Sequence, residues 1–234
     1  NSYGSMGVSQ AQNDAMAYAY HKGALPIVAA GNDNWNAAYT TPANSPFVVT
    51  VGATQKAMNA GEADYYAYFS NYGANLDIAA PGQDILSLNA ANSVLAQSQP
   101  SNIVNNNYLR LSGTSMATPY VAGMAALIKA RNPSYTPAQI SYALSNISSS
   151  PSWKIYQGYT PTPLANIGQS INTSQAADLK VAITSPNPYQ EGNNNHFIKT
   201  ALVLQGTAMG SQFARYTVSY KKIDPSAAWS DSYT

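Results

Sequence analysis

Cysteine is absent from the 234-residue sequence, and charged residues make up only 9% of it. Without cysteine, this chain forms neither disulfide bonds nor thiolate metal sites. Soluble domains usually contain roughly 25% charged residues, and the net charge here is only +1. Such a balance gives no electrostatic reason to expect nucleic acid or an anionic membrane as a partner. No apolar run approaches the roughly 18 residues of a membrane span.

The chain does have enough apolar material to fold. Hydrophobic residues make up 45% of it, which argues against disorder, and its length permits one large or two modest domains. Strand-like and helix-like segments alternate, which is typical of an α/β fold. A helix is predicted from Ser9 to Lys22, opened by a capping box of Ser9 and Gln12 and closed by Gly23. Residues 136–139 predict a second cap of the same kind.

The most informative stretch is residues 111–123, which places Ser115 between a short apolar strand and a helix of small residues. At such a junction the hydroxyl projects from the turn, and the unpaired N–H groups of the first helical turn point toward the same space. These donors and the helix dipole favour negative charge beside the serine oxygen. Pro119 is expected in the first turn of the helix, where its missing N–H costs little. The helix is apolar nearly all round, which predicts burial against a sheet.

Residues 113–119, Gly-Thr-Ser-Met-Ala-Thr-Pro, closely resemble the nucleophile segment of the subtilisin-like serine proteases, the subtilases. Residues 29–32 resemble the Ala-Ala-Gly-Asn segment of that family. The resemblance implies that Ser115 is the nucleophile, and that the Asn32 side chain and the Ser115 backbone N–H donate to the oxyanion. Taken alone, Ser115 could instead cap a buried helix and Asn32 could be a turn residue after a strand. Their joint occurrence, in the order and spacing of the family, favours the protease interpretation.

The resemblance also implies a substrate-binding region. Ser2, Tyr3 and Gly4 resemble the Ser-x-Gly segment whose backbone pairs with the bound peptide, and Ala30 and Gly31 would form a wall of the specificity pocket. Residues 68–73 and 76–82 resemble the Phe-Ser-x-x-Gly and Asp-x-x-Ala-Pro-Gly segments, to which we assign a scaffold role only. No cofactor is required. Structural calcium is compatible with the resemblance, but no metal ligands are assigned, because no Asp/Glu cluster has the spacing of calcium ligands.

The general base is not evident in the sequence. Its two histidines, His21 and His196, both lie outside any His-Gly-Thr-His setting, and the Asp-Thr-Gly-like turn of the family is absent. His21 is expected at a helix end, where a cation suits the dipole. Because the family's triad runs Asp, His, Ser along the chain, both missing members are expected upstream of Asn1. The sequence is therefore interpreted as the C-terminal part of a protease domain, inactive alone, whose partner is the upstream part of the same domain.

The sequence pattern changes after Asp178. Residues 179–184 alternate with period two, and residues 201–205 and 216–221 suggest further strands. We therefore divide the chain into residues 1–178, a three-layer subtilisin-like α/β fold with a parallel sheet and a missing N-terminal part, and residues 179–234. The second region resembles the start of an all-β immunoglobulin-like sandwich, which usually needs about 100 residues.

The sequence thus favours a serine endopeptidase, secreted or at the cell surface, that acts on proteins. One alternative is an inactive scaffold, which would lack the upstream His or Asp. A second is adhesion carried by residues 179–234, which would survive loss of the protease region.

Overall fold

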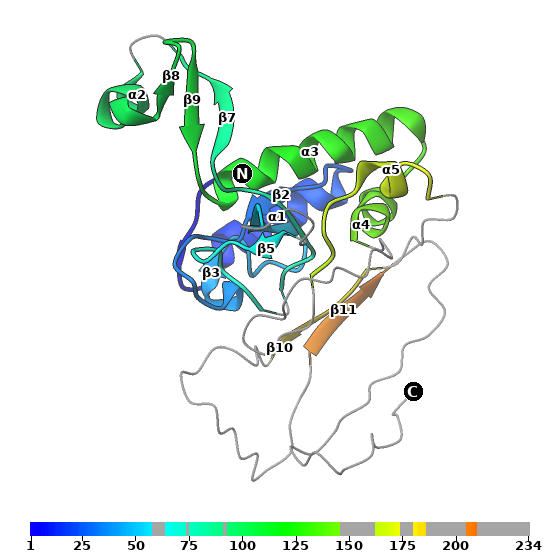
Figure 1. Cartoon of the computed structure of the whole chain (residues 1–234). Coiled ribbons are helices and arrows are strands. Elements are labelled where there is room, and N and C mark those ends of the chain that lie inside the picture. The colour runs from blue at the N-terminus through cyan, green and yellow to red at the C-terminus, as the bar shows by residue number, and fades with distance from the viewer. Residues whose placement is uncertain are drawn as a thin grey trace, which may run out of the picture.

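The computed structural model describes residues 1–57, 64–73, 75–90, 93–145, 162–173, 180–185 and 205–209, the last two ranges as backbone only. Within these ranges a parallel sheet is covered by helices on both faces (Figure 1). The α/β prediction is therefore confirmed for the described residues. His196 lies outside them.

The central sheet is built on β4 (Val49–Gln55), which pairs in parallel with β2 (Ile27–Ala29) on one side and β6 (Ile78–Pro81) on the other. The short β5 (Tyr65–Tyr66) pairs with the end of β4 in antiparallel orientation. Asn1 continues the sheet beyond β2, because its carbonyl accepts from the Ala29 N–H at 3.0 Å. Leu164 forms a parallel bridge with Ala79 beyond β6. All residues of β4 except the last are buried, as expected for a parallel strand covered on both faces.

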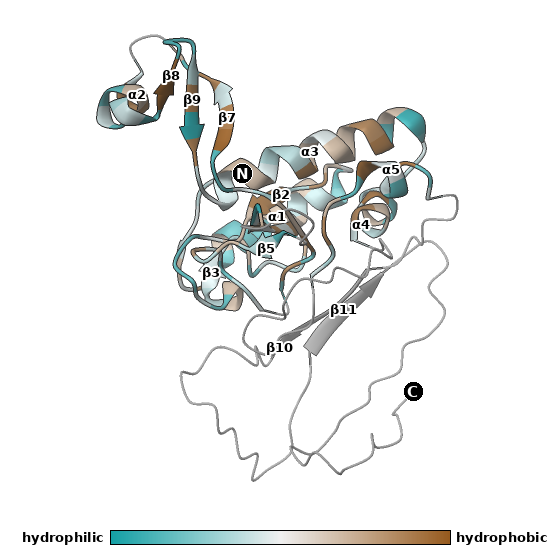
Figure 2. Ribbon diagram, in the orientation of Figure 1, coloured by the Kyte–Doolittle hydropathy of each residue, from teal (hydrophilic) through white to brown (hydrophobic). Residues whose placement is uncertain are grey.

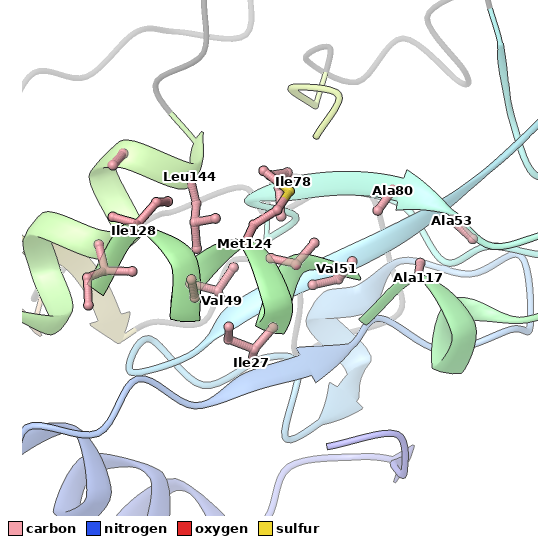
Figure 3. Close-up of a cluster of buried hydrophobic side chains, with 14 of the residues drawn as sticks. Ile27, Val49, Val51, Ala53, Ile78, Ala80, Ala117, Met124, Ile128 and Leu144 are labelled. Atoms are coloured by element: carbon pink, nitrogen blue, oxygen red, sulfur yellow. The ribbon is translucent and has the colours of Figure 1, made fainter. Parts of the chain in front are cut away.

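Helices α3 (Thr114–Arg131) and α4 (Pro137–Ser145) cover one face of the sheet, and α1 (Gln10–His21) covers the other. Side chains of all three parallel strands point toward α3 and α4 (Figure 3). The residues of this cluster that Figure 3 labels are Ile27, Val49, Val51, Ala53, Ile78, Ala80, Ala117, Met124, Ile128 and Leu144. On the opposite face Met16 of α1 packs with Val28. The alternation of Ile27 and Val28 between the two faces therefore holds the three layers together.

The two predicted helix caps form in different ways. Ser9 Oγ accepts from the Gln12 N–H, but the Gln12 side chain accepts from Thr41 Oγ1 at 2.8 Å instead of turning back to Ser9. Only half of that capping box forms, because a tertiary partner competes for Gln12. At α4 the box is complete. Gln139 Oε1 accepts from the Thr136 N–H at 2.9 Å, and Thr136 Oγ1 accepts from the Gln139 N–H at 3.2 Å.

Burial of α3 against the sheet confirms the prediction, and this burial is confined to one side of the helix. Its buried apolar residues recur every three or four positions and face the sheet. Its opposite face is exposed at Ala122, Gly123, Ala126 and Leu127, the last at 52%. An apolar composition alone could not reveal this, because small residues are compatible with either environment.

A three-stranded antiparallel sheet stands apart from the central sheet (Figure 1). It consists of β7 (Ile85–Leu88), β9 (Tyr108–Leu111) and β8 (Ile103–Val104), with α2 (Val94–Ser98) and the 3₁₀ turn η2 (Pro100–Asn102) between β7 and β8. Brown segments of β7 and β8 in Figure 2 mark hydrophobic residues there. β9 leads directly into α3, so this sheet is attached next to Ser115.

The remaining elements are short. β1 (Ser5–Met6) pairs with β3 (Thr40–Thr41), which follows η1 (Ala37–Tyr39), and α5 (Ile167–Ser170) lies near α4. β10 (Lys180–Ser185) pairs antiparallel with β11 (Gln205–Met209). β10 agrees with the strand predicted at residues 179–184. The strand predicted at residues 216–221 lies outside the described residues, so the immunoglobulin-like sandwich stays a prediction.

Candidate active site

Ser115 and Asn32, which the sequence separates by more than 80 positions, meet at the carboxyl edge of the parallel sheet. Asn32 follows β2, and Ser115 lies in the first turn of α3. The turn before α3 is anchored to the end of β6, because the Gly113 N–H donates to the Gly82 carbonyl at 2.7 Å. Loops at the carboxyl ends of parallel strands are where open α/β sheets bind ligands.

Thr114 fixes the orientation of the Asn32 side chain. Asn32 Oδ1 accepts from the Thr114 N–H at 2.8 Å and from Thr114 Oγ1 at 3.0 Å. The same Oγ1 accepts from the Gly31 N–H at 3.2 Å. Because a backbone N–H can only donate, these bonds assign the oxygen of the Asn32 amide and leave Nδ2 as a donor. Among the described residues, Nδ2 has no hydrogen-bond acceptor.

Gly113 keeps open the space beside the two predicted oxyanion donors. Its φ of +155° lies in a region that side-chain-bearing residues rarely adopt. A Cβ at this position would lie 3.4 Å from Asn32 Nδ2 and 3.6 Å from the Ser115 backbone nitrogen. Both donors therefore border the same small region, which a side chain at position 113 would occupy. The Ser115 N–H has no acceptor in the described part of the chain, as expected for the first turn of a helix.

Ser2 is hydrogen-bonded to Ser115 in both directions. Ser115 Oγ donates to the Ser2 carbonyl at 3.4 Å, and Ser2 Oγ donates to the Ser115 carbonyl at 3.1 Å. The second bond explains the position of Pro119, which is the sixth residue of α3 and not in the first turn as predicted. In a regular helix the N–H of residue 119 would donate to the Ser115 carbonyl. Proline has no N–H, so Ser2 supplies the donor.

The substrate-binding residues predicted from sequence differ in exposure. Ser2, Tyr3 and Gly4 are exposed, and no backbone hydrogen bond of Tyr3 or Gly4 occurs within the described ranges. Ala30 is fully buried and packs with Ala37, Leu76 and Tyr66. Gly31 is half-buried and has a φ of +106°. The roles of these residues in substrate binding stay predictions.

His21 is placed at the end of α1, as predicted, where its ring contacts those of Tyr20 and Phe47. No histidine is hydrogen-bonded to Ser115 in the part of the chain that the structure describes. Within the same residues, no three His, Cys, Asp or Glu side chains gather as metal ligands. Structural calcium stays a prediction, and no chemical step is derived from it.

Sequence reasoning missed two residues of the site. Thr114 orients Asn32, and the buried Asn71 is hydrogen-bonded to the loop that carries Asn32. Asn71 belongs to the segment interpreted as scaffold. The signal that could have identified both was their place inside motifs already noted, next to Ser115 and within residues 68–73.

The fold and this geometry place Ser115 and the Asn32 amide together at the carboxyl edge of the sheet in a three-layer α/β protein. The sequence matches the subtilase family over residues 1–200, and the chain belongs to that family. It is similar to alkaline protease 1 of Aspergillus oryzae, with 37% identity over 70% of this chain and 36% of that protein. It is also similar to an extracellular serine proteinase of a Thermus species, with 41% identity over 59% of this chain and 29% of that one.

Solved structures agree with this membership. A cold-adapted subtilisin-like serine proteinase matches with a TM-score of 0.56 and 35% identity, over 69% of this chain and 51% of that one. The subtilisin-like fold is therefore shown for the part of the chain that matches. The chain spans about a third of the length of the two relatives above and about half of that solved structure.

Proposed function

We propose that the whole protein is a serine endopeptidase that hydrolyses peptide bonds in proteins. The observation that carries the proposal is the orientation of Asn32, whose Oδ1 is held by Thr114 so that Nδ2 is left to donate beside the Ser115 N–H. Two such donors, fixed before substrate binds, stabilise the oxyanion of a tetrahedral intermediate. A structural serine at a helix start would need neither donor.

The reaction follows from these positions. Ser115 Oγ attacks the carbonyl carbon of the scissile peptide, and the carbonyl oxygen takes up the negative charge between Asn32 Nδ2 and the Ser115 N–H. A histidine accepts the Ser115 proton and passes it to the leaving amine as the C–N bond breaks, and an aspartate orients that histidine. Water then attacks the acyl-serine, which releases the carboxylic acid product and restores the Ser115 hydroxyl. We place the histidine and the aspartate upstream of Asn1 in the whole protein, in the order typical of the family. Residues 1–234 alone are then inactive.

The described surface is consistent with an upstream part of the domain. The outer edge of β2 is paired only by Asn1 among the described residues, and the outer face of α3 is exposed at Leu127 and its neighbours. Sheet edges and apolar helix faces are normally covered in the interior of a domain. An upstream segment that adds strands at β2 and packs on α3 would cover both.

The substrate is proposed to bind as an extended strand along Ser2, Tyr3 and Gly4. These residues are exposed and lie beside Ser115, and the backbone groups of Tyr3 and Gly4 have no described partners. Such groups can pair with an incoming peptide by β-strand addition.

The relative from Thermus is named an extracellular proteinase, which supports a secreted or cell-surface location for this protein as well. No described helix has the length and hydropathy needed to cross a membrane.

A covalent label tests the proposal directly. The whole protein is treated with a fluorophosphonate, which reacts with an activated serine, and the modified peptide is identified by mass spectrometry. We expect modification at Ser115, and we expect casein hydrolysis to fall in proportion to the fraction of protein that is modified. Ser112 provides the matched control, because it lies at the same junction and its Oγ instead accepts from the Asp84 N–H at 2.9 Å. Ser112→Ala is expected to label normally, and Ser115→Ala is expected not to label.

The alternatives give different results. An inactive scaffold would show neither labelling nor hydrolysis in the whole protein. Adhesion as the main activity would show surface binding by residues 179–234 that persists in Ser115→Ala and after removal of residues 1–178.

A further inference from the structure

Asn71 is the most completely hydrogen-bonded side chain near the site, although it touches neither Ser115 nor the Asn32 side chain in the described structure. It is fully buried, at 0% exposure. Its Nδ2 donates to the Ala30 carbonyl at 2.9 Å and to Thr40 Oγ1 at 3.1 Å. Its Oδ1 accepts from the Asp33 and Trp35 N–H groups, both at 3.0 Å. Both donor and both acceptor positions of the amide are therefore used.

These bonds lie on both sides of Asn32 along the chain. The side chain of Asn71 holds Ala30 before Asn32, and Asp33 and Trp35 after it. The backbone N–H of Asn71 adds a bond to the Gly31 carbonyl at 2.9 Å. Asn32 itself is exposed, and within the described residues its side chain has only the two bonds that Oδ1 accepts from Thr114. Asn71 thus holds the backbone on both sides of Asn32, alongside the bond from the Gly31 N–H to Thr114 Oγ1.

Gly31 shows how closely Asn71 approaches this loop. A Cβ at position 31 would collide with Asn71 Nδ2, and the φ of +106° is one that favours glycine. The Asn71 carbonyl is in turn held by Tyr66 Oη at 2.6 Å and Ser70 Oγ at 3.1 Å. Asn71 therefore connects the loop to the buried end of the sheet, and it cannot shift without breaking several bonds at once.

We propose that Asn71 is a positioning residue for catalysis, which sets the direction of the Asn32 amide toward the oxyanion. The proposal rests on the endopeptidase function proposed above. Asn32 would donate fully only when negative charge develops in the transition state, so loss of its alignment lowers kcat and leaves KM nearly unchanged. A displacement of about 1 Å at a catalytic group can cost about 10²-fold in rate.

A double-mutant cycle between Asn71 and Asn32 in the whole protein tests this role. Asn71→Asp keeps both acceptor contacts, but it places an oxygen opposite the Ala30 carbonyl, so the loop must shift. We expect kcat to fall about 10- to 10²-fold, measured per serine titrated with a fluorophosphonate. In the Asn32→Ala background the same substitution should cost less than about threefold, because two residues that act through one interaction are not additive. Titration per reactive serine removes any loss that comes from unfolded protein.

A matched control separates positioning from general damage. Asn36 is another buried asparagine, and its Oδ1 accepts only the Ala38 N–H at the start of η1. Asn36→Asp keeps that acceptor and is expected to leave kcat per titrated serine unchanged. If Asn71→Asp does not fold, Thr40→Val replaces it in the same double-mutant cycle. This substitution removes one acceptor of Asn71 Nδ2 at a buried site, so we expect a smaller loss of kcat.

The outcomes are distinct. An equal loss of kcat in both backgrounds, or a change in KM alone, would overturn the positioning role while leaving the endopeptidase function intact. Absence of a titratable serine in the unsubstituted whole protein would instead overturn the proposed function. Full activity of Asn32→Ala would overturn the oxyanion role of Asn32 and, with it, the positioning role of Asn71. A loss of kcat that disappears in the Asn32→Ala background supports both.

Discussion

The two ends of α3 are built on different interactions. From Ala117 onward, the helix packs apolar side chains against the sheet, and residues such as Val121 and Ile128 have no exposed surface. Its first turn instead contains Thr114, which forms a hydrogen-bonded group with Gly31, Asn32 and Asn71 beside Ser115; we call this group the polar junction. Packing is non-directional, whereas hydrogen bonds fix the direction of each group.

This difference separates stability from chemistry within one helix. Burial of apolar area supplies the folding free energy, and it tolerates small shifts of individual atoms. The polar junction has to hold Asn32 and the Ser115 N–H on one small region of space, and small shifts there cost rate. Substitutions in the packed part should therefore change the amount of folded protein, and substitutions in the polar junction should change the rate per folded molecule.

The largest effect is expected for Ser115→Ala. Loss of the nucleophile should lower kcat about 10⁶-fold, a magnitude known from a member of this same family. The free energy of unfolding should change little, because the hydroxyl is only partly buried and its one described acceptor is at 3.4 Å. Peptide hydrolysis and thermal unfolding of the whole protein measure the two quantities. Substantial remaining activity would remove Ser115 from its proposed role.

Asn32→Ala is expected to lower kcat about 10²–10³-fold with little change in KM. This range also comes from a subtilase. Asn32→Asp sharpens the test, because the carboxylate keeps the acceptor for Thr114 but loses the Nδ2 donor. Equal losses in the two variants would identify the donor as the functional group. Normal turnover of Asn32→Asp would show that kcat depends on the contact with Thr114 and not on the Nδ2 donor.

Ile128→Ala tests the packed part of α3. The side chain is fully buried between α3 and the sheet, so its truncation should cost about 2–5 kcal/mol of unfolding free energy. Ile128→Val, which removes less volume, should cost about 0.5–1.5 kcal/mol. Chemical denaturation gives both values. The kcat per titrated serine should stay unchanged in both variants, and a parallel fall in kcat would break the separation between packing and chemistry.

Tyr66→Phe tests the buried support of the polar junction through pH. Burial raises the pKa of Tyr66, whose hydroxyl donates to the Asn71 carbonyl at 2.6 Å. The folded protein therefore keeps the phenol protonated where the unfolded chain, with a pKa of about 10, loses the proton. The stability contributed by Tyr66 is thus complete below about pH 10 and decreases as the pH rises above it.

At neutral pH we expect Tyr66→Phe to cost about 1 kcal/mol, the usual net value of one hydrogen bond. The difference from the unsubstituted protein should shrink as the pH rises beyond about 10. Unfolding free energies of both proteins at several pH values on either side of that point provide the test. A constant difference would mean that Tyr66 does not titrate differently in the folded and unfolded states.

The smallest effect is expected for Arg110→Ala. Arg110 Nη1 lies 2.7 Å from Asp84 Oδ2, but the two side chains are 44% and 66% exposed. Exposed ion pairs contribute about 0–1 kcal/mol and weaken as salt increases. Thermal unfolding at low and high salt should show a small difference that disappears at high salt. A larger loss of stability would mean that the pairing of β7 with β9 stabilises α3 more strongly than the exposure of these two side chains indicates.

The sequence indicated those candidate site residues that can be identified from their neighbours along the chain. Ser115 at a strand-to-helix junction and Asn32 after a buried strand were both evident from local pattern. The bond between Asn32 and Thr114 was not, because the two residues are 82 positions apart. The contacts of Asn71 with residues 30–35 are likewise tertiary, and no local pattern distinguishes such an asparagine from one in a turn.

Tertiary contacts also decided which of the predicted helix caps formed completely. The capping box at Thr136 forms as predicted, because each of the two side chains accepts from the backbone N–H of the other residue. The matching pattern at Ser9 forms only in part, because Thr41 donates to the Gln12 side chain. The composition of α3 predicted its burial against the sheet, but small apolar residues do not reveal which face of a helix a neighbour covers.

The bond from Ser2 to the Ser115 carbonyl has a consequence for the order of folding. It joins residues 113 positions apart, so a long stretch of chain must fold before it can form. Contacts with such large separations carry a high loop-closure entropy and tend to form late. Because Pro119 has no N–H, the regular helical donor to that carbonyl is missing, and Ser2 Oγ donates to it instead. A chain with α3 formed but Ser2 not yet in place would lack both hydrogen bonds between Ser2 and Ser115, so the surroundings of Ser115 would be completed late in folding.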